Sequence, residues 1–210
     1  MPPSPTIPYL HIPESHGLFL PPSTSTTPPN SPTHIGTHSC QTCIALYLPL
    51  LPSPTTPRAF AAHINAYIYS THFSLRLRVA CTDAEGIAMQ THTISKLHKT
   101  GLTRGSIDIQ NVIIVCPNLY TPDGGKRPGW YVVQGILEFM GWPEGVCCDE
   151  EAQGFVVELG EGGSVVMVSK ELKREERETW WLEGKEGRRY EMRVVEGKEE
   201  EWKIWTERKY

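Results

Sequence analysis

Apolar runs and turn-forming segments alternate through the first half of the chain. Residues 43–51 (CIALYLPLL) and 59–69 (AFAAHINAYIY) are apolar runs of the length of buried β-strands. The link between them is short and rich in proline, which is typical of a turn. We therefore expect the two runs to pair as an antiparallel hairpin.

Two helices are predicted by apolar periodicity and by the residues at their ends. Thr82 followed by Glu85 is typical of a capping box, and the apolar positions after it recur at helical spacing. This pattern predicts a helix at about 83–99. Pro128 is suited to the first turn of a second helix, whose apolar stripe ends before Gly141.

Further strands are expected in the second half of the chain. Residues 107–115 have the pattern of a buried strand, and residues 154–159 and 164–169, joined by glycines, are typical of a hairpin. Three alternating segments follow near the end, at about 179–183, 189–195 and 201–206. The order of these elements predicts an α+β fold, with a layered mixed or antiparallel sheet and two main helices.

Composition divides the chain into three parts. Residues 1–57 contain one charged residue, Glu14, and ten prolines fall within the first 35 positions. Such a sequence buries too little apolar surface to offset chain entropy, so residues 1–33 are predicted to be a disordered tail. Residues 34–170 are expected to form the α+β domain. Residues 171–210 are rich in charge and tryptophan, which indicates a polar, β-rich extension.

Charge and hydropathy restrict the expected partners and location. The chain has 210 residues and a formal net charge of −4, so no global basic field is available to bind nucleic acid. No apolar run is long enough for a transmembrane helix, and the first residues lack the features of a signal peptide. We expect a cytoplasmic or nuclear protein with reduced cysteines and a protein as substrate or partner, and no membrane partner. The oligomeric state is left open.

One group of residues in the hairpin region carries candidate chemistry. If the turn centres on Ser53, Cys43 lies directly opposite His63, with Cβ atoms about 5 Å apart. The imidazole could then take the thiol proton, and the ion pair would lower the pKa of the cysteine. Backbone N–H groups beside Cys43 could face an oxyanion. Four residues could orient the histidine: Thr37, His38, Ser39 and Thr42.

This pattern resembles the CheD family of chemoreceptor glutamine deamidases, which are related in fold to the catalytic domain of cytotoxic necrotizing factor. The resemblance lies within residues 36–68. It is carried by the spacing of Thr37 and Cys43, by the strand Cys43-Ile-Ala-Leu-Tyr47 and by the pair Ala62-His63. It implies a CheD-like sandwich in which Cys43 is the nucleophile, His63 the base and Thr37 the orienting residue.

A second resemblance concerns the N-terminal asparagine amidohydrolases of eukaryotes. It is carried by Thr42-Cys43 and by His63-Ile-Asn65. The two resemblances imply a cysteine amidohydrolase that acts on a glutamine or asparagine side chain of a protein through a thioester. Thr42 and Asn65 would then be secondary residues near the oxyanion, and neither a metal nor an organic cofactor is expected. Cys43 should also be the most reactive thiol near neutral pH.

Other interpretations of the same residues are open. Cys43 and His63 could be ordinary core residues. Cys40-x2-Cys43 has the spacing of a zinc-ligand pair or a redox pair, but the sequence offers no second close pair of ligands. The alternative function is a catalytically inactive α+β protein-interaction module with a proline-rich tail.

Overall fold

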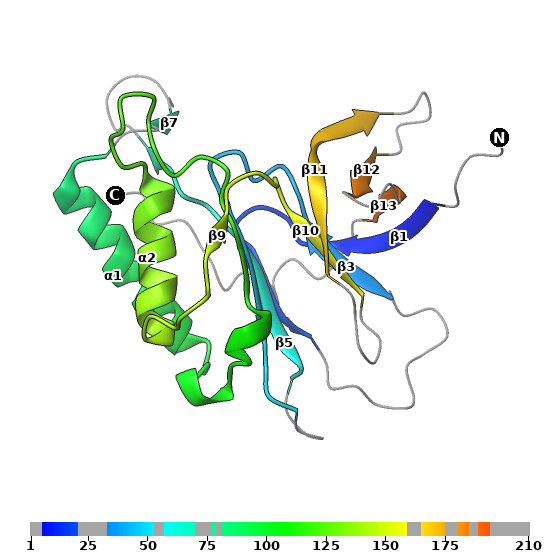
Figure 1. Ribbon diagram of the computed structural model, residues 1–210, viewed down its shortest axis with the longest axis horizontal. Helices are drawn as coiled ribbons and strands as arrows, with labels where there is room; N and C mark the ends of the chain where they lie inside the picture. The colour runs from blue at the N-terminus through cyan, green and yellow to red at the C-terminus, as the bar shows by residue number, and fades with distance from the viewer. Residues whose placement is uncertain are drawn as a thin grey trace.

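A five-stranded sheet separates two helices from a small β-barrel (Figure 1). The structure is a computed structural model that describes residues 6–20, 33–52, 57–69, 77–78, 81–158, 165–174, 180–184 and 189–193. Within these residues the fold is α+β, with two α-helices and mixed sheets. The predicted α+β class with two helices is therefore confirmed, whereas the CheD-like sandwich stays a prediction.

The central sheet contains the predicted hairpin. Its strand order is β2 (His16–Leu20), β5 (Ala59–Ile64), β4 (Ile44–Pro49), β8 (Ile113–Val115) and β9 (Cys148–Asp149). The first four strands are antiparallel to their neighbours, and β9 runs parallel to β8. Of the strand predicted at 107–115, only the last part is extended, because residues 109–111 form a 3-10 turn.

The register of the hairpin differs from the expected one by two positions. Ala45, and not Cys43, lies opposite His63. Side chains alternate between the two faces of a strand, so a shift of two keeps Cys43 and His63 on the same face. The predicted direct opposition of Cys43 and His63 is therefore wrong, although both residues remain on one side of the sheet.

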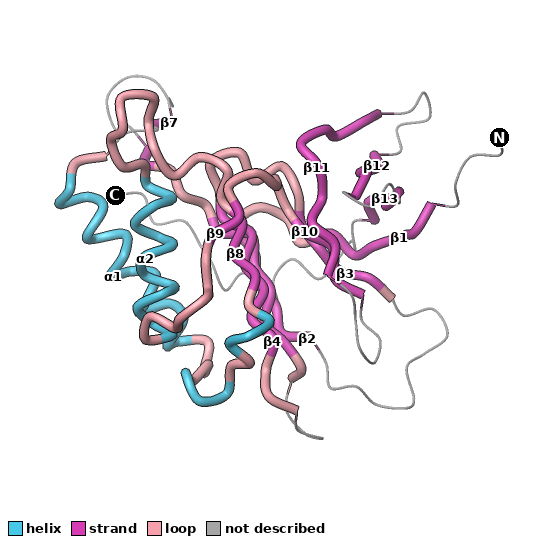
Figure 2. The backbone as a smooth tube through the Cα atoms, in the orientation of Figure 1, coloured by secondary structure: helices cyan, strands magenta, loops and turns pink. Residues whose placement is uncertain are grey.

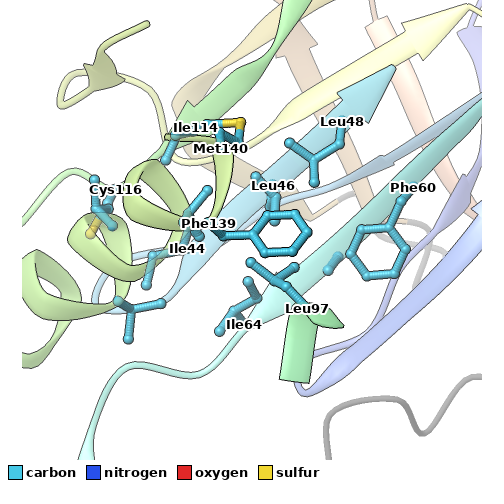
Figure 3. Close-up of a cluster of buried hydrophobic side chains, with 14 of the residues drawn as sticks. Ile44, Leu46, Leu48, Phe60, Ile64, Leu97, Ile114, Cys116, Phe139 and Met140 are labelled. Carbon is cyan, nitrogen blue, oxygen red and sulfur yellow. The ribbon is translucent and has the colours of Figure 1, made fainter. Parts of the chain in front are cut away.

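The helices cover one face of the sheet. The predicted helices are confirmed as α1 (Asp83–Lys99) and α2 (Pro128–Met140). At the start of α1, Thr82 and Glu85 form the capping box, and α2 ends at Gly141 with a φ of 76°. Alternate residues of β4 and β5 pack against the helices in a buried core, shown in Figure 3, that includes Ile44, Leu46, Leu48, Phe60, Ile64, Leu97 and Met140.

The other face of the sheet packs against the barrel. The barrel strands, in order, are β1 (Thr6–His11), β13 (Arg189–Arg193), β12 (Trp180–Gly184), β11 (Val165–Arg174), β10 (Phe155–Glu158) and β3 (His34–Thr37). Ile35 of β3 and Phe155 of β10 share a buried cluster with Ala45 and Ala61 of the sheet. A separate two-stranded sheet joins β6 (Ile68–Tyr69) to β7 (Leu77–Arg78).

Two predicted boundaries do not hold for the described residues. The tail predicted at 1–33 contains β1 and β2, and its residues Tyr9, Ile12 and Leu20 are buried. Composition alone missed these short strands because they are stabilised by pairing with distant strands. The predicted boundary between the domain and the C-terminal extension, at 170/171, falls inside β11. This strand belongs to the barrel together with β12 and β13. The segment expected at 201–206 lies outside the described residues.

Gly36 permits the close approach of β3 to β10, directly before Thr37. A Cβ atom at Gly36 would overlap the carbonyl oxygen of Phe155 and lie 2.9 Å from the Cα atom of Val156. Both neighbours are backbone atoms, so we expect Gly36→Ala to lower the free energy of unfolding by at least about 2 kcal/mol. Gly105→Ala is the matched control, because its Cβ would meet no atom within 4 Å. Chemical denaturation of both variants tests this, and equal stability would contradict it.

Candidate functional site

Polar side chains gather between the central sheet and the barrel. Figure 2 shows loops collected at the end of the sheet beside β10 and β3, and the loop from β3 to β4 is one of them. Thr37 ends β3, and His63 points from β5 toward the same side. His63 is 4% exposed and Thr37 is fully buried, so hydrogen bonds within the protein must satisfy both side chains.

The hydroxyl of Thr37 fixes the tautomer of His63. Thr37 Oγ1 lies 2.9 Å from the carbonyl oxygen of Ile12 and 2.7 Å from His63 Nδ1. A carbonyl oxygen only accepts, so the one hydroxyl proton is donated to Ile12 and Oγ1 accepts the proton of Nδ1. His63 Nε2 therefore carries a lone pair. The predicted role of Thr37, to orient His63, has the geometry it requires.

The thiol beside His63 is Cys40. Its Sγ atom lies 3.6 Å from His63 Nε2, so the thiol can donate to the free lone pair. Ser39, with a φ of 60°, turns the loop ahead of Cys40, and the Cys40 N–H donates to the Gln153 carbonyl at 2.9 Å. The contact predicted for Cys43 is thus made by a cysteine three residues earlier in the loop.

Cys43 lies in a second, more outward group with Asn65. Its thiol is 3.5 Å from Glu14 Oε1 and 3.6 Å from Asn65 Oδ1. The Asn65 amide donates to Ser15 Oγ at 2.5 Å and to Tyr67 Oη at 2.7 Å, which holds its oxygen toward Cys43. Cys43 is 5% exposed and Cys40 is 0% exposed, whereas Glu14 is exposed. Cys43 is therefore the thiol nearer to solvent.

Thr42 is half-buried next to Cys43. Hydrogen bonds from the Ala66 backbone and the Thr42 side chain act to lower the pKa of Cys43, against larger opposing effects. The loop is anchored from outside by Asn118, whose amide donates to the Gln41 carbonyl at 2.6 Å. The structure thus brings the predicted residues into two adjoining groups, one with Thr37 and His63 and one with Cys43, Asn65 and Thr42.

Sequence reasoning missed the residues that the N-terminal segment contributes. Ile12 and Glu14 fall within the region predicted to be a tail, yet both contact the site. Glu14 offered one signal, since it is the only charged residue among the first 57. The sequence pattern indicates Cys40 only as part of a zinc-ligand pair or a redox pair with Cys43.

The electrostatics of the site favour neutral groups. Burial, followed by His38 and His16, lowers the pKa of His63 to about 3. Burial and then Glu14 raise the pKa of Cys43 to about 12, and burial raises the pKa of Cys40 well above its usual range. The predicted thiolate–imidazolium pair is therefore not the resting state. His63 is a neutral base facing a neutral thiol.

The described residues contain no cluster of three or more histidine, cysteine or acidic side chains placed to hold a metal ion. The six cysteines, all of which lie in the described part of the chain, form no disulfide bond. In the described part of the chain, no helix is both long and apolar enough to cross a membrane.

Comparison with known proteins gives no independent assignment. No protein-family model matches the chain, and no curated protein matches it either. The candidate site is therefore interpreted from its own geometry and chemistry.

Two buried histidines, His38 and His63, and the half-buried His11 should make the fold sensitive to acid. Burial is the main cause that lowers the pKa of His11 and His63 to about 3 and of His38 to about 4. The unfolded chain takes up these protons below about pH 6.5, so it binds more protons than the folded protein. The free energy of unfolding should then fall as the pH drops from about 6.5 toward 4. Thermal unfolding across this range tests the sign, and a flat profile would contradict it.

The resting thiols should react in order of exposure. Cys147 is exposed, whereas burial and Glu14 raise the pKa of Cys43 and so disfavour its thiolate. We expect limiting iodoacetamide to label Cys147 before Cys43, and Cys40 only after unfolding. Peptide mapping at several time points measures the order. Earlier labelling of Cys43 would indicate an activated thiolate in the resting protein and would contradict the neutral pair.

Proposed function

We propose that the protein is a cysteine-dependent amidohydrolase that hydrolyses the side-chain carboxamide of asparagine or glutamine, with a fold related to the CheD-like deamidases. One observation carries the proposal. A row of hydrogen bonds runs from the Ile12 carbonyl through Thr37 to His63, whose Nε2 lone pair faces the thiol of Cys40. Nucleophilic catalysis requires such an oriented base close to a thiol, and Cys43 lies in the adjoining group.

His63 is the proposed general base. Its low pKa keeps the imidazole neutral at physiological pH, so Nε2 is free to take a proton when the thiol attacks. The Thr37 contact keeps the ring from turning its protonated nitrogen toward the thiol. Proton transfer is thus coupled to attack on the substrate and does not precede it.

Cys43 is the proposed nucleophile. It is the outer of the two thiols and contacts the exposed residue Glu14, so a substrate side chain can approach it. Ala45 pairs with His63, which makes Cys43 a diagonal neighbour of His63 on the same face of the sheet. Diagonal neighbours on adjacent strands are about 7–8 Å apart, so in the proposed reaction the substrate has to bring the short Cys43 side chain to the His63 ring. Cys40, which contacts His63 directly, is the competing nucleophile that the experiment below must separate from Cys43.

The proposed reaction has two halves. The sulfur of Cys43 attacks the carboxamide carbon while His63 takes the thiol proton, and backbone N–H groups near Thr42 stabilise the oxyanion. His63 returns the proton to the leaving nitrogen, and ammonia departs from the tetrahedral intermediate, which leaves a thioester on Cys43. Water then hydrolyses the thioester, which yields the carboxylate and restores the thiol.

Glu14 favours a substrate that carries a positive charge beside its amide. Its carboxylate raises the pKa of Cys43, and a cation bound against Glu14 would offset that effect. An asparagine or glutamine at the start of a peptide carries its α-ammonium group close to the carboxamide. Of the two families that the sequence resembles, the N-terminal asparagine amidohydrolases fit this feature better. An internal glutamine is the second substrate to test.

The proposal is tested with three matched peptides: one with a free N-terminal asparagine, the same peptide acetylated, and one with an internal glutamine. Ammonia release and the mass change of deamidation are the readouts. We expect Cys43→Ser and His63→Gln to lower kcat/KM by about a hundredfold or more, since each removes a part of the thiol–base unit. The double variant should be no worse than either single one, because the pair acts as a unit. Cys147→Ser is the control and should behave as wild type.

Cys40→Ser separates the two thiols. If Cys43 is the nucleophile, this variant should keep kcat/KM within a few fold of wild type. Loss of activity in Cys40→Ser with retention in Cys43→Ser would move the nucleophile to Cys40. A wild-type protein that releases no ammonia from any peptide would refute the amidohydrolase and leave the interaction module.

A further inference from the structure

A second histidine lies beside the base. His16 of β2 is directly opposite His63 in the ladder with β5, so the two rings share one face of the sheet. Its Nδ1 atom is 2.6 Å from the carbonyl oxygen of Glu14. Because a carbonyl oxygen only accepts, Nδ1 carries the proton and Nε2 carries the lone pair.

The Nε2 atom of His16 is a buried acceptor with no hydrogen-bond partner among the described residues. An acceptor left in this state carries a desolvation cost that a donor would remove. Its position adds to the interest of this atom. His16 lies two residues after Glu14, whose carboxylate contacts Cys43, and directly opposite His63, which contacts Cys40; the sheet order β2-β5-β4 places His63 between His16 and β4.

We propose that His16 Nε2 accepts an N–H of the substrate's carboxamide, and that His16 thereby selects primary amides. This inference rests on the proposed amidohydrolase. An NH₂ group only donates, so it satisfies the unpaired lone pair. The carboxylate product only accepts and would meet the same lone pair unfavourably, which promotes its release. His16 accepts only a hydrogen bond, and the proton that leaves with ammonia comes from the thiol through His63.

The test compares an amide with an ester that lacks the N–H donors. The two substrates are the peptide with N-terminal asparagine and the same peptide with the β-methyl ester of aspartate in its place. The readout is the ratio of kcat/KM for the amide to kcat/KM for the ester. We expect His16→Phe, which keeps a ring without an acceptor, to lower this ratio about tenfold or more. His16→Gln can place its amide oxygen near the position of Nε2 and should retain most of the ratio.

Two further variants complete the design. His16→Leu repeats the removal of the acceptor in case the Phe variant does not fold, and far-UV circular dichroism checks each variant. His98→Phe is the matched control on exposed α1 surface and should leave the ratio as in wild type. Inhibition by the aspartate product should also become stronger in the variants without an acceptor.

The outcomes separate the two proposals. If wild type hydrolyses both substrates and the ratio is unchanged in His16→Phe and His16→Leu, the role of His16 is overturned while the amidohydrolase stands. An equal loss on both substrates would also overturn it, since it would indicate a general structural effect. If wild type hydrolyses neither substrate, the proposed function fails and the inference fails with it.

Discussion

The single proton of the Thr37 hydroxyl is the constraint on which the site depends. It is donated to the Ile12 carbonyl, so the same oxygen must accept from His63. These two bonds join three distant segments: the chain after β1, the end of β3 and strand β5. The two bonds therefore link the barrel to the sheet, and they also determine which nitrogen of His63 carries the proton. A backbone carbonyl that comes from outside the apparent catalytic motif decides which imidazole nitrogen is basic.

Burial keeps both the base and the two thiols of the site in their neutral forms. The barrel covers His63, and the lost solvation lowers its pKa, which keeps the ring neutral and able to accept a proton. The same burial raises the pKa of both neighbouring thiols. His63 and the two thiols are therefore neutral at rest. In the proposed reaction, a substrate has to change the surroundings of Cys43, and Glu14 is the charged group through which a cationic substrate would do so.

How far the sequence predicts this structure depends on whether local or distant residues decide each feature. The helices were predictable because Thr82, Glu85 and Pro128 act within one turn of their own helix. The β4–β5 pair was predictable from its apolar runs, but its register was not, since the proline-rich link does not fix the centre of the turn. The face that carries His63 was still correct, because a shift of two preserves alternation. Strands β1 and β2 were missed, since their partners β13, β3 and β5 lie far away in the sequence.

The two cysteines of the β3–β4 loop illustrate why a motif does not specify a site by itself. The spacing of Thr37 and Cys43 points to Cys43 as the partner of His63, yet the loop places Cys40 against Nε2 and leaves Cys43 beside Glu14. Cys40 and Cys43 belong to the same loop, between β3 and β4. A change in the conformation of this loop would therefore alter which sulfur atom contacts His63. A fully buried thiol cannot receive a substrate without such a change, whereas Cys43 already borders an exposed carboxylate. At rest, the thiol nearer to solvent is Cys43 and the thiol that contacts the base is Cys40. The proposed reaction at Cys43 therefore requires the substrate to bring the Cys43 sulfur to His63.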